Sequence, residues 1–297
     1  MPNAPAPYAL TLVAARDAAA LSAATLDRVR DAAGAGAPVI LSPGEAADLP
    51  CPAPPDPARV AAALEGAPID AVVTPGEDRR KRLLVADMDS TIVTSETLDE
   101  IAAYAGLKER VAEITRRSMN GELDFAAALR ERVGLLRGLG LDALERTWER
   151  TRLTPGAREV VATMRAHGAK TALVSGGFTY FTERVAALCG FDVHRANTLL
   201  DDGRALTGAV GEPIVDRDAK LATLHELVAK HWLSMDQSLA VGDGANDLAM
   251  IRAAGLGVAY HAKPIVAAEA RARVDHADLR ALLFIQGYSA REFAAVD

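Results

Sequence analysis

The stretch of sequence that decides the fold reads Leu83-Leu84-Val85-Ala86-Asp87-Met88-Asp89-Ser90-Thr91. Its first four residues form a short, continuous apolar run, which is typical of a strand buried on both faces of a parallel sheet. Two carboxylates, Asp87 and Asp89, follow directly after this run. Side chains two residues apart in an extended backbone point to the same side. We therefore expect both acidic groups to lie together where the strand ends.

Two later segments repeat the arrangement of an apolar run followed by glycine and polar residues. The run 171–174 precedes Ser175-Gly176-Gly177, and the run 239–241 precedes Gly242-Asp243-Gly244-Ala245-Asn246-Asp247. Segments with helical spacing lie between these runs, and this alternation predicts an α/β fold with a doubly wound, parallel, Rossmann-like sheet. In such a sheet the functional site lies beyond the carboxyl ends of the strands. We expect all three polar segments at that edge.

The regions around this predicted sheet indicate how the chain is divided. Residues 95–152 have helical spacing and no convincing strand, which predicts a small helical cap inserted into the sheet domain. Residues 1–78 are rich in alanine and proline and predict a small α/β domain of the order β-α-β-α-β. Its expected elements are strands at 8–14, 38–41 and 69–73 and helices at 18–33 and 58–64. The predicted domains are therefore 1–78 and 79–297.

Composition argues against several classes of protein. The 297 residues include 33 Lys and Arg against 40 Asp and Glu, and a net charge of −7 argues against a nucleic-acid partner held by phosphate neutralisation. We interpret the basic run 79–82 as a solvated linker. Two cysteines form no disulfide framework. No basic leader and no run of about 20 apolar residues is present, so we expect a cytoplasmic protein without a membrane partner.

The polar residues expected after the predicted strands are of types suited to catalysis. Asp87, Asp89 and Asp243 would repel one another at one edge unless a cation lies between them, and oxygen ligands of this kind suit Mg²⁺ shared with a substrate phosphate. Ser175 supplies a hydroxyl, and Lys220, near the start of a predicted helix, supplies a compact positive charge for a phosphate. Together these groups predict phosphoryl transfer through an aspartyl-phosphate.

At these residues the sequence resembles the haloacid dehalogenase superfamily of phosphatases. The segment 87–91 is similar to its first motif, DxDxT, and Ser175, Lys220 and the segment 242–247 are similar to its second, third and fourth motifs. Within the superfamily the resemblance is greatest to the phosphoserine phosphatase family, whose DMDST form is present verbatim. The resemblance covers about residues 80 to 290.

The resemblance implies hydrolysis of O-phospho-L-serine to L-serine and phosphate, the last step of serine biosynthesis. It implies that Asp87 is the nucleophile and Asp89 the general acid and base. It implies that Mg²⁺ is bound by the carboxylates of Asp87 and Asp243 and the backbone carbonyl of Asp89, with Asp247 supporting this set. The residues that it implies for substrate contact are Glu96 for the ammonium group, Arg132 for the carboxylate, Met119 and Phe125 of the cap, Ser175, Gly176, Gly177, Lys220 and Asn246.

The sequence leaves alternatives open. Arg130 competes with Arg132 for the substrate carboxylate, and the substrate could be another small phosphomonoester. In a different class, the chain could be an amino-acid-sensing protein with vestigial catalysis. The region 1–78 is similar to the amino-acid-binding regulatory domains (ACT-like) fused to some of these phosphatases, although its predicted order is shorter than β-α-β-β-α-β. Serine sensing, formation of a homodimer and a purely structural role all remain open for it.

Overall fold

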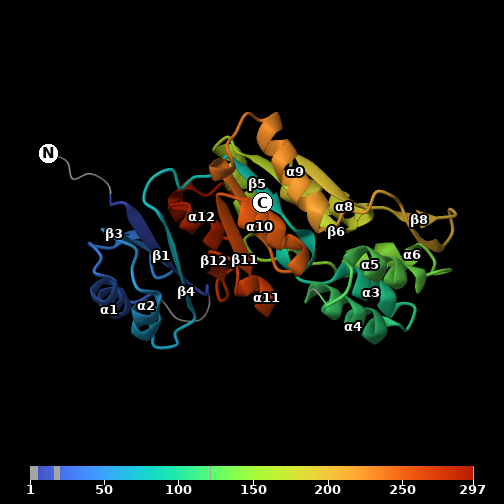
Figure 1. Cartoon of the computed structure of the whole chain (residues 1–297), viewed down its shortest axis with the longest axis horizontal. Helices are drawn as coiled ribbons and strands as arrows, with labels where there is room; N and C mark the ends of the chain where they lie inside the picture. The colour runs from blue at the N-terminus through green and yellow to red at the C-terminus, as the bar shows by residue number, and fades with distance from the viewer. Residues whose placement is uncertain (1–5, 17–20, 121, 297) are drawn as a thin grey trace. The chain divides into compact units, whose positions relative to one another are not determined.

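The computed structural model describes residues 6–16, 21–120 and 122–296, and these form two compact units (Figure 1). The first unit comprises Met1–Lys81, Pro155–Gly168 and Ala272–Asp297, and the second comprises Arg82–Thr154 and Ala169–Arg271. The first unit thus draws in segments from later in the chain. The predicted boundary between residues 78 and 79 stays a prediction.

An antiparallel sheet with the strand order β2-β3-β1-β4 forms the centre of the first unit. Its strands are β1 (Tyr8–Ala14), β2 (Val39–Ser42), β3 (Ala46–Cys51) and β4 (Ile69–Pro75), and its helices are α1 (Ala23–Ala33) and α2 (Pro57–Leu64). Leu10 and Leu12 of β1 belong to the same buried cluster as Val29 of α1 and Val60 of α2. Burial of these apolar side chains stabilises the pairing of sheet and helices.

Strand β3 was missing from the sequence prediction, so the expected order β-α-β-α-β was wrong. The observed order is β-α-β-β-α-β. Pro50 and the charged Asp48 interrupt the apolar alternation of this segment, and both are depleted in strands. The structure accommodates Asp48 because its buried carboxylate accepts a hydrogen bond from Thr11 and pairs with Arg79, contacts that only the tertiary structure supplies.

The later segments of the first unit contribute α7 (Ala157–Ala166), β12 (Ala272–Val274), α12 (Ala281–Ile285) and the short turn η4 (Ala290–Glu292). The buried carboxylate of Asp70 in β4 accepts hydrogen bonds from the backbone N–H groups of Asp275, His276 and Ala277 at 2.8–3.2 Å. Charge-assisted hydrogen bonds of this kind are stronger than neutral ones. They tie the segment after β12 to the four-stranded sheet.

In the second unit the strands follow the order β11-β10-β5-β6-β7 and run parallel. Their bounds are β5 (Leu83–Ala86), β6 (Lys170–Phe178), β7 (Val193–Asn197), β10 (Ser238–Gly242) and β11 (Leu256–Tyr260). The helices that alternate with them are α8 (Thr179–Cys189), α9 (Arg217–Lys230), α10 (Leu248–Ala253) and α11 (Pro264–Ala267), with the turns η2 (Met235–Gln237) and η3 (Ala245–Asp247). Alternation of strand and helix along a parallel sheet confirms the predicted Rossmann-like fold.

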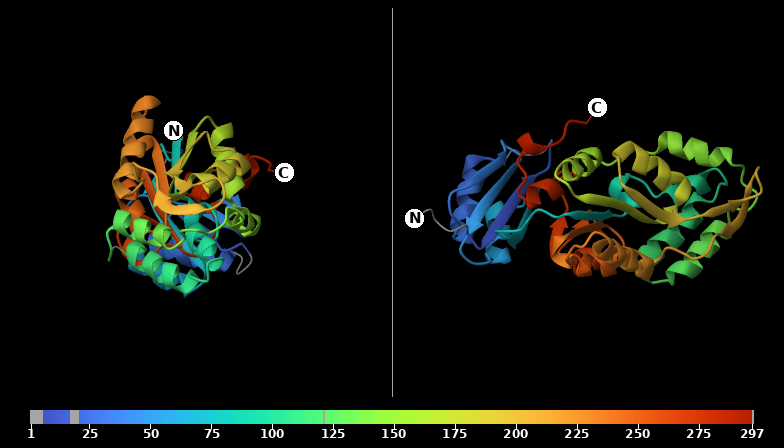
Figure 2. Two further views of the ribbon diagram at one scale, coloured as in Figure 1. Left: turned by 90° about the vertical axis from the view of Figure 1, so that its right-hand side faces the viewer. Right: turned by 90° about the horizontal axis from the view of Figure 1, so that it is seen from above.

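Four helices between β5 and β6 form the predicted cap. They are α3 (Thr97–Ala103), α4 (Lys108–Met119), α5 (Phe125–Gly134) and α6 (Asp142–Arg150). The hairpin of β8 (Leu199–Asp201) and β9 (Leu206–Val210) packs against α5. Figure 2 shows the four green helices gathered with this gold hairpin at one end of the second unit. The cap is therefore built from two parts of the chain, the four helices and the hairpin. The sequence predicted the helical part.

Candidate active site

Three neighbouring strands bring the predicted site residues to one edge of the sheet. Strand β5 lies between β10 and β6, and all three run in the same direction. Asp87 follows the last residue of β5, Asp243 follows β10, and Ser175 lies in the carboxyl-terminal part of β6. Because the register is parallel, the three groups emerge side by side. The turn η1 (Met88–Ile92) then carries the chain away from β5 toward the cap.

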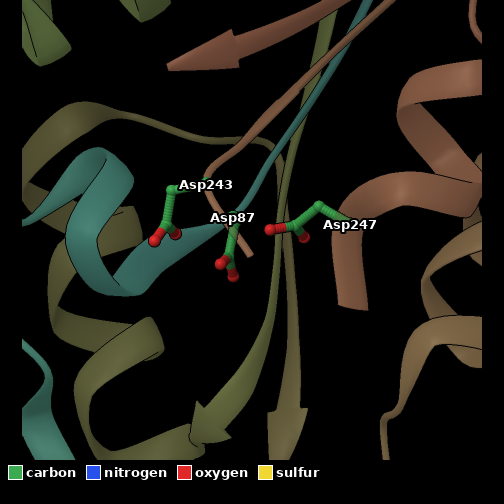
Figure 3. Close-up of side chains that lie close together, drawn as sticks. All are labelled: Asp87, Asp243 and Asp247. Atoms are coloured by element: carbon green, nitrogen blue, oxygen red, sulfur yellow. The ribbon is translucent and has the colours of Figure 1, made fainter. Parts of the chain in front are cut away.

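Three carboxylates lie together at this edge. Asp87, Asp243 and Asp247 are all buried, and each offers an oxygen within 4.8 Å of one from each of the others. In Figure 3 the carboxylate of Asp87 lies between those of Asp243 and Asp247. Burial raises the pKa of Asp87 to about 7, with Asp247 adding to the shift and Lys220 opposing it. Burial, and then Glu96, likewise raise the pKa of Asp243.

Lys220 of α9 is the cation inside this acidic cluster. Its side chain is fully buried, and Nζ lies 2.7 Å from Oδ1 of Asp87 and 2.7 Å from Oδ1 of Asp247. Burial alone would lower the pKa of Lys220, but the two carboxylates outweigh it and the net shift is upward. Lys220 is therefore a permanent positive charge that fixes the orientation of Asp87.

The donor atoms of this cluster fit a divalent cation. One ammonium group faces three buried carboxylates, and like charges this close are unfavourable without a further cation. Oδ2 of Asp243 is buried and accepts no hydrogen bond from the described residues, and the ammonium of Lys263 lies 3.8 Å away. Both oxygens of Asp247 are occupied, by Lys220 and by the backbone N–H of Gly244. Asp87 and Asp243 are thus the carboxylates with capacity for a metal ion.

Asp89 lies two residues after Asp87 and also lines the pocket beside the cap. Its Oδ1 accepts a hydrogen bond of 3.0 Å from the backbone N–H of Thr97. Desolvation, and then the negative charge of Glu96, raise the pKa of Asp89 well above its usual value. A raised pKa makes a carboxyl group better suited to act as a general acid.

Positions 176 and 177, after Ser175, both require glycine. A Cβ on Gly177 would lie 2.5 Å from Oδ2 of Asp89 and 3.0 Å from Oγ of Ser175. Gly176 is equally confined, because its Cβ would lie 2.6 Å from the ring of Phe125. The backbone N–H of Gly177 also donates to Oγ of Ser175 at 2.8 Å, which orients that hydroxyl. The two glycines let the loop approach both the catalytic edge and the cap.

We predict that Gly177→Ala lowers kcat by about 100-fold, because the new methyl group displaces the Asp89 carboxylate and small misplacements of catalytic groups have effects of this size. The control is Gly134→Ala in α5, where the nearest atom to a new Cβ is 4.0 Å away. Steady-state kinetics of both variants test this, with thermal unfolding to establish that each is folded. Unchanged kcat in Gly177→Ala would contradict the placement of Asp89.

A pocket opens between this edge and the cap. It is lined by Asp87, Asp89, Glu96, Leu98, Phe125, Leu129, Arg132, Ser175, Gly176, Gly177, Phe178 and Asn246. It brings together the carboxylate of Glu96, the guanidinium of Arg132 and the carboxylates of Asp87 and Asp89. Most of the substrate residues expected from the sequence lie in this lining. Lys220 and Asp243 are not among these lining residues. Lys220 contacts Asp87, and Asp243 lies beside Asp87.

Glu96 is held in the pocket by a neighbouring hydroxyl. Oγ of Ser90 donates a hydrogen bond of 2.6 Å to Oε1 of Glu96. Ser90 has a φ of 54°, a left-handed conformation that non-glycine residues seldom adopt. Conformations of this kind persist where the surrounding structure fixes them, often at functional sites. The turn after β5 therefore orients Glu96 as well as Asp89.

The two arginines of α5 that the sequence offered for the substrate carboxylate lie in different surroundings. Arg132 is 3% exposed and lines the pocket, whereas Arg130 is exposed and forms an ion pair of 2.7 Å with Glu212. Phe125 and Leu129 share the face of Arg132, because residues separated by four and by three positions lie on one side of a helix. That spacing was present in the sequence and could have identified Leu129, which the sequence analysis missed.

Asn246 and Met119 are the remaining residues that the sequence predicted for substrate contact. Asn246 in η3 is buried in the pocket lining, and its Oδ1 accepts no hydrogen bond from the described residues. Met119 lies in the last turn of α4, and its side chain is outside the described part of the structure. A second cavity of about 280 Å³ adjoins the pocket and shares Phe125 and Asn246 with it.

Comparison with known proteins matches residues 81–255 to the family of haloacid dehalogenase-like hydrolases. The chain belongs to this family. It is 43% identical over 247 residues to a phosphoserine phosphatase of Streptomyces coelicolor, an alignment that covers 82% of this chain and 60% of that protein. It is 45% identical over 199 residues to a phosphoserine phosphatase of Streptococcus thermophilus, covering 67% of this chain and 93% of that protein.

A solved structure described as a phospho-aspartyl intermediate analogue of phosphoserine phosphatase is also similar to this hydrolase. It has a TM-score of 0.66 and 38% identity, and the match covers 69% of this chain and 98% of that one. The chain spans between 54% and 64% of the length of the first four curated relatives it matches. The family match over residues 81–255 contains the strands β5, β6, β7 and β10 and the helices of the cap.

Proposed function

We propose that this hydrolase is a Mg²⁺-dependent phosphoserine phosphatase, which converts O-phospho-L-serine and water into L-serine and phosphate in the last step of serine biosynthesis. The observation that carries the proposal is the single pocket in which Glu96 and Arg132 face the edge that bears Asp87 and Asp89. Phosphoserine has an ammonium group, a carboxylate and a phosphate. Glu96 is complementary to the ammonium group and Arg132 to the carboxylate, and Lys220 beside Asp87, together with bound Mg²⁺, would supply positive charge for the phosphate.

The first half of the reaction transfers the phosphoryl group to the protein. A carboxylate oxygen of Asp87 attacks phosphorus, and the bond from phosphorus to the serine oxygen breaks. Asp89 gives its proton to the departing serine oxygen, for which its raised pKa is suited. Lys220 and the Ser175 hydroxyl stabilise the negative charge on the phosphoryl oxygens. The products of this half are L-serine and an aspartyl-phosphate.

The second half releases phosphate. Asp89, now deprotonated, takes a proton from a water molecule whose oxygen attacks phosphorus, and the bond to Asp87 breaks. Asp87 is then again a carboxylate, Asp89 again holds a proton, and one water has been consumed. When bound, Mg²⁺ supplies positive charge that offsets the crowding of carboxylates and phosphate. The residues proposed to hold it are Asp87 and Asp243 through their side chains and Asp89 through its backbone carbonyl.

Release of phosphate from a panel of phosphomonoesters with added Mg²⁺ tests the proposal. We predict a strong preference for phosphoserine over simple sugar phosphates, and loss of activity when the metal is removed with a chelator. We further predict that Arg132→Ala lowers kcat/KM for phosphoserine by about 100-fold, the effect of losing a charged hydrogen-bond donor in a buried site.

The matched control is Arg130→Ala, which removes an exposed ion pair and is expected to change kcat/KM little. Phosphoethanolamine, which lacks the carboxylate, should be used equally well by the unaltered chain and by Arg132→Ala. An equal loss on both substrates would contradict the role of Arg132. Absence of any preference for phosphoserine would favour another small phosphomonoester, and absence of all turnover would favour the amino-acid-sensing alternative.

We further propose a cytoplasmic location and no membrane partner. None of the helices in the described part of the chain combines the length and apolarity that crossing a membrane requires. The chain has two cysteines in 297 residues and so no disulfide framework, which supports a reducing, cytoplasmic location. We also propose that residues 1–78 form a domain similar to amino-acid-binding regulatory domains, supported by its β-α-β-β-α-β order. Sedimentation with and without L-serine would test whether this domain binds serine or forms a homodimer.

A further inference from the structure

The guanidinium of Arg132 is held by a chain of two further polar side chains. Nη1 of Arg132 donates to Oγ1 of Thr115 at 3.0 Å, and Oγ1 of Thr115 donates to Oδ1 of Asp99 at 2.7 Å. Nε of Arg132 donates to the backbone carbonyl of Ala128 at 3.2 Å. The three side chains come from different helices, α5, α4 and α3. They therefore link the elements of the cap through one hydrogen-bonded path.

Each member of this path is buried. Arg132 is 3% exposed, Thr115 4% and Asp99 8%. A buried guanidinium without a counter-charge is unfavourable, and burial lowers the pKa of Arg132 while Asp99 and Glu96 oppose that shift. The pKa of Asp99 is raised to about 6, chiefly by burial, so that this carboxyl is still charged at neutral pH. Asp99 thus compensates the arginine through the intervening hydroxyl.

The direction of these hydrogen bonds determines where Arg132 points. Because the Thr115 hydroxyl donates its proton to Asp99, it presents its lone pairs to Arg132 and accepts a hydrogen bond from Nη1. Among the described residues, Nη2 of Arg132 has no acceptor, and the side chain lines the pocket beside Glu96 and Asp89. Nε and Nη1 are thus both held by residues of the cap. The free donors are left for a ligand.

We propose that Thr115 and Asp99 are positioning residues that orient Arg132 and so determine the preference for phosphomonoesters that carry a carboxylate. This inference rests on the proposed function, in which Arg132 binds the carboxylate of phosphoserine. Neither residue touches the reacting atoms. Their removal should weaken substrate selection and leave phosphoryl transfer intact.

Thr115→Val tests this, because it keeps the shape of the side chain and removes the hydroxyl. With Mg²⁺ present, kcat/KM is measured for O-phospho-L-serine and for phosphoethanolamine, and their ratio is compared with that of the unaltered chain. We expect the ratio to fall about tenfold, mainly through KM for phosphoserine, since one hydrogen bond to a charged group is lost. Thr115→Ser keeps the hydroxyl and should retain the ratio.

Asp99→Asn is the second variant, which removes the charge and keeps the size. We expect it to lower the same ratio, and because the ratio is taken within each preparation it does not depend on the fraction of folded protein. An unchanged ratio in both Thr115→Val and Asp99→Asn, or an equal fall in Thr115→Ser, would overturn the inference. If the unaltered chain itself does not prefer phosphoserine over phosphoethanolamine, the proposed function fails instead.

Discussion

Lys220→Met should lower both the stability and the activity of the protein. The buried ammonium lies 2.7 Å from a carboxylate oxygen of Asp87 and from one of Asp247. Removing it leaves two buried carboxylates without their partner, and we expect the free energy of unfolding to fall by about 3–5 kcal/mol. We expect kcat to fall by about 1,000-fold, because Asp87 loses its orientation and the phosphoryl oxygens lose a positive charge.

Denaturant unfolding and steady-state kinetics measure the two effects. The control is Lys230→Met in the last turn of the same helix, α9, where the side chain is exposed and should matter little to either quantity. Added Mg²⁺ should restore part of the lost stability of Lys220→Met, since a cation then again offsets the carboxylates. A variant as stable and active as the unaltered chain would contradict the bridging role of Lys220.

Asp87→Asn should abolish turnover, with a loss of at least about 10⁴-fold in kcat, because an amide oxygen does not displace the serine oxygen at phosphorus. The fold should be retained, since the substitution keeps the size of a buried side chain and removes one of three crowded negative charges. Phosphate release and circular dichroism of the purified variant measure the two expectations.

The comparison for this variant is Asp89→Asn. It retains the proposed nucleophile and lacks the general acid and base, so a phosphoenzyme should form slowly and persist. If Asp87→Asn retained substantial turnover while Asp89→Asn formed no phosphoenzyme, the assignment of the two carboxylates would be reversed. If both variants remained fully active, the edge of the sheet described here would not be the reacting site.

The sheet edge could be predicted from the sequence because its signals are local. The apolar run 83–86 and the acidic pair after it lie within one short stretch, and the parallel order of β10, β5 and β6 brings the other strand ends beside it. The helical cap could be predicted for the same reason, from spacing alone. The place of the hairpin β8–β9 against α5 depends on tertiary packing, which the sequence does not reveal.

The parts that the sequence did not reveal depend on contacts between distant residues. Strand β3 carries Asp48 and Pro50, and its charge is satisfied by Arg79, 31 positions away. Thr115 and Asp99 look like ordinary helix residues until the packing of α3, α4 and α5 places them behind Arg132. Lys220 was predicted as a phosphate ligand, and only the structure places it between Asp87 and Asp247.

We propose that the phosphoryl group passes through Asp87. The most direct measurement is to quench the protein with acid during turnover of phosphoserine, digest it, and locate the phosphoryl group by mass spectrometry. We expect a phosphoryl group on the peptide that contains Asp87, stable in acid and labile in base, and absent from the Asp87→Asn variant. A phosphoryl group on Ser175 or on another residue, or none during rapid turnover, would contradict it.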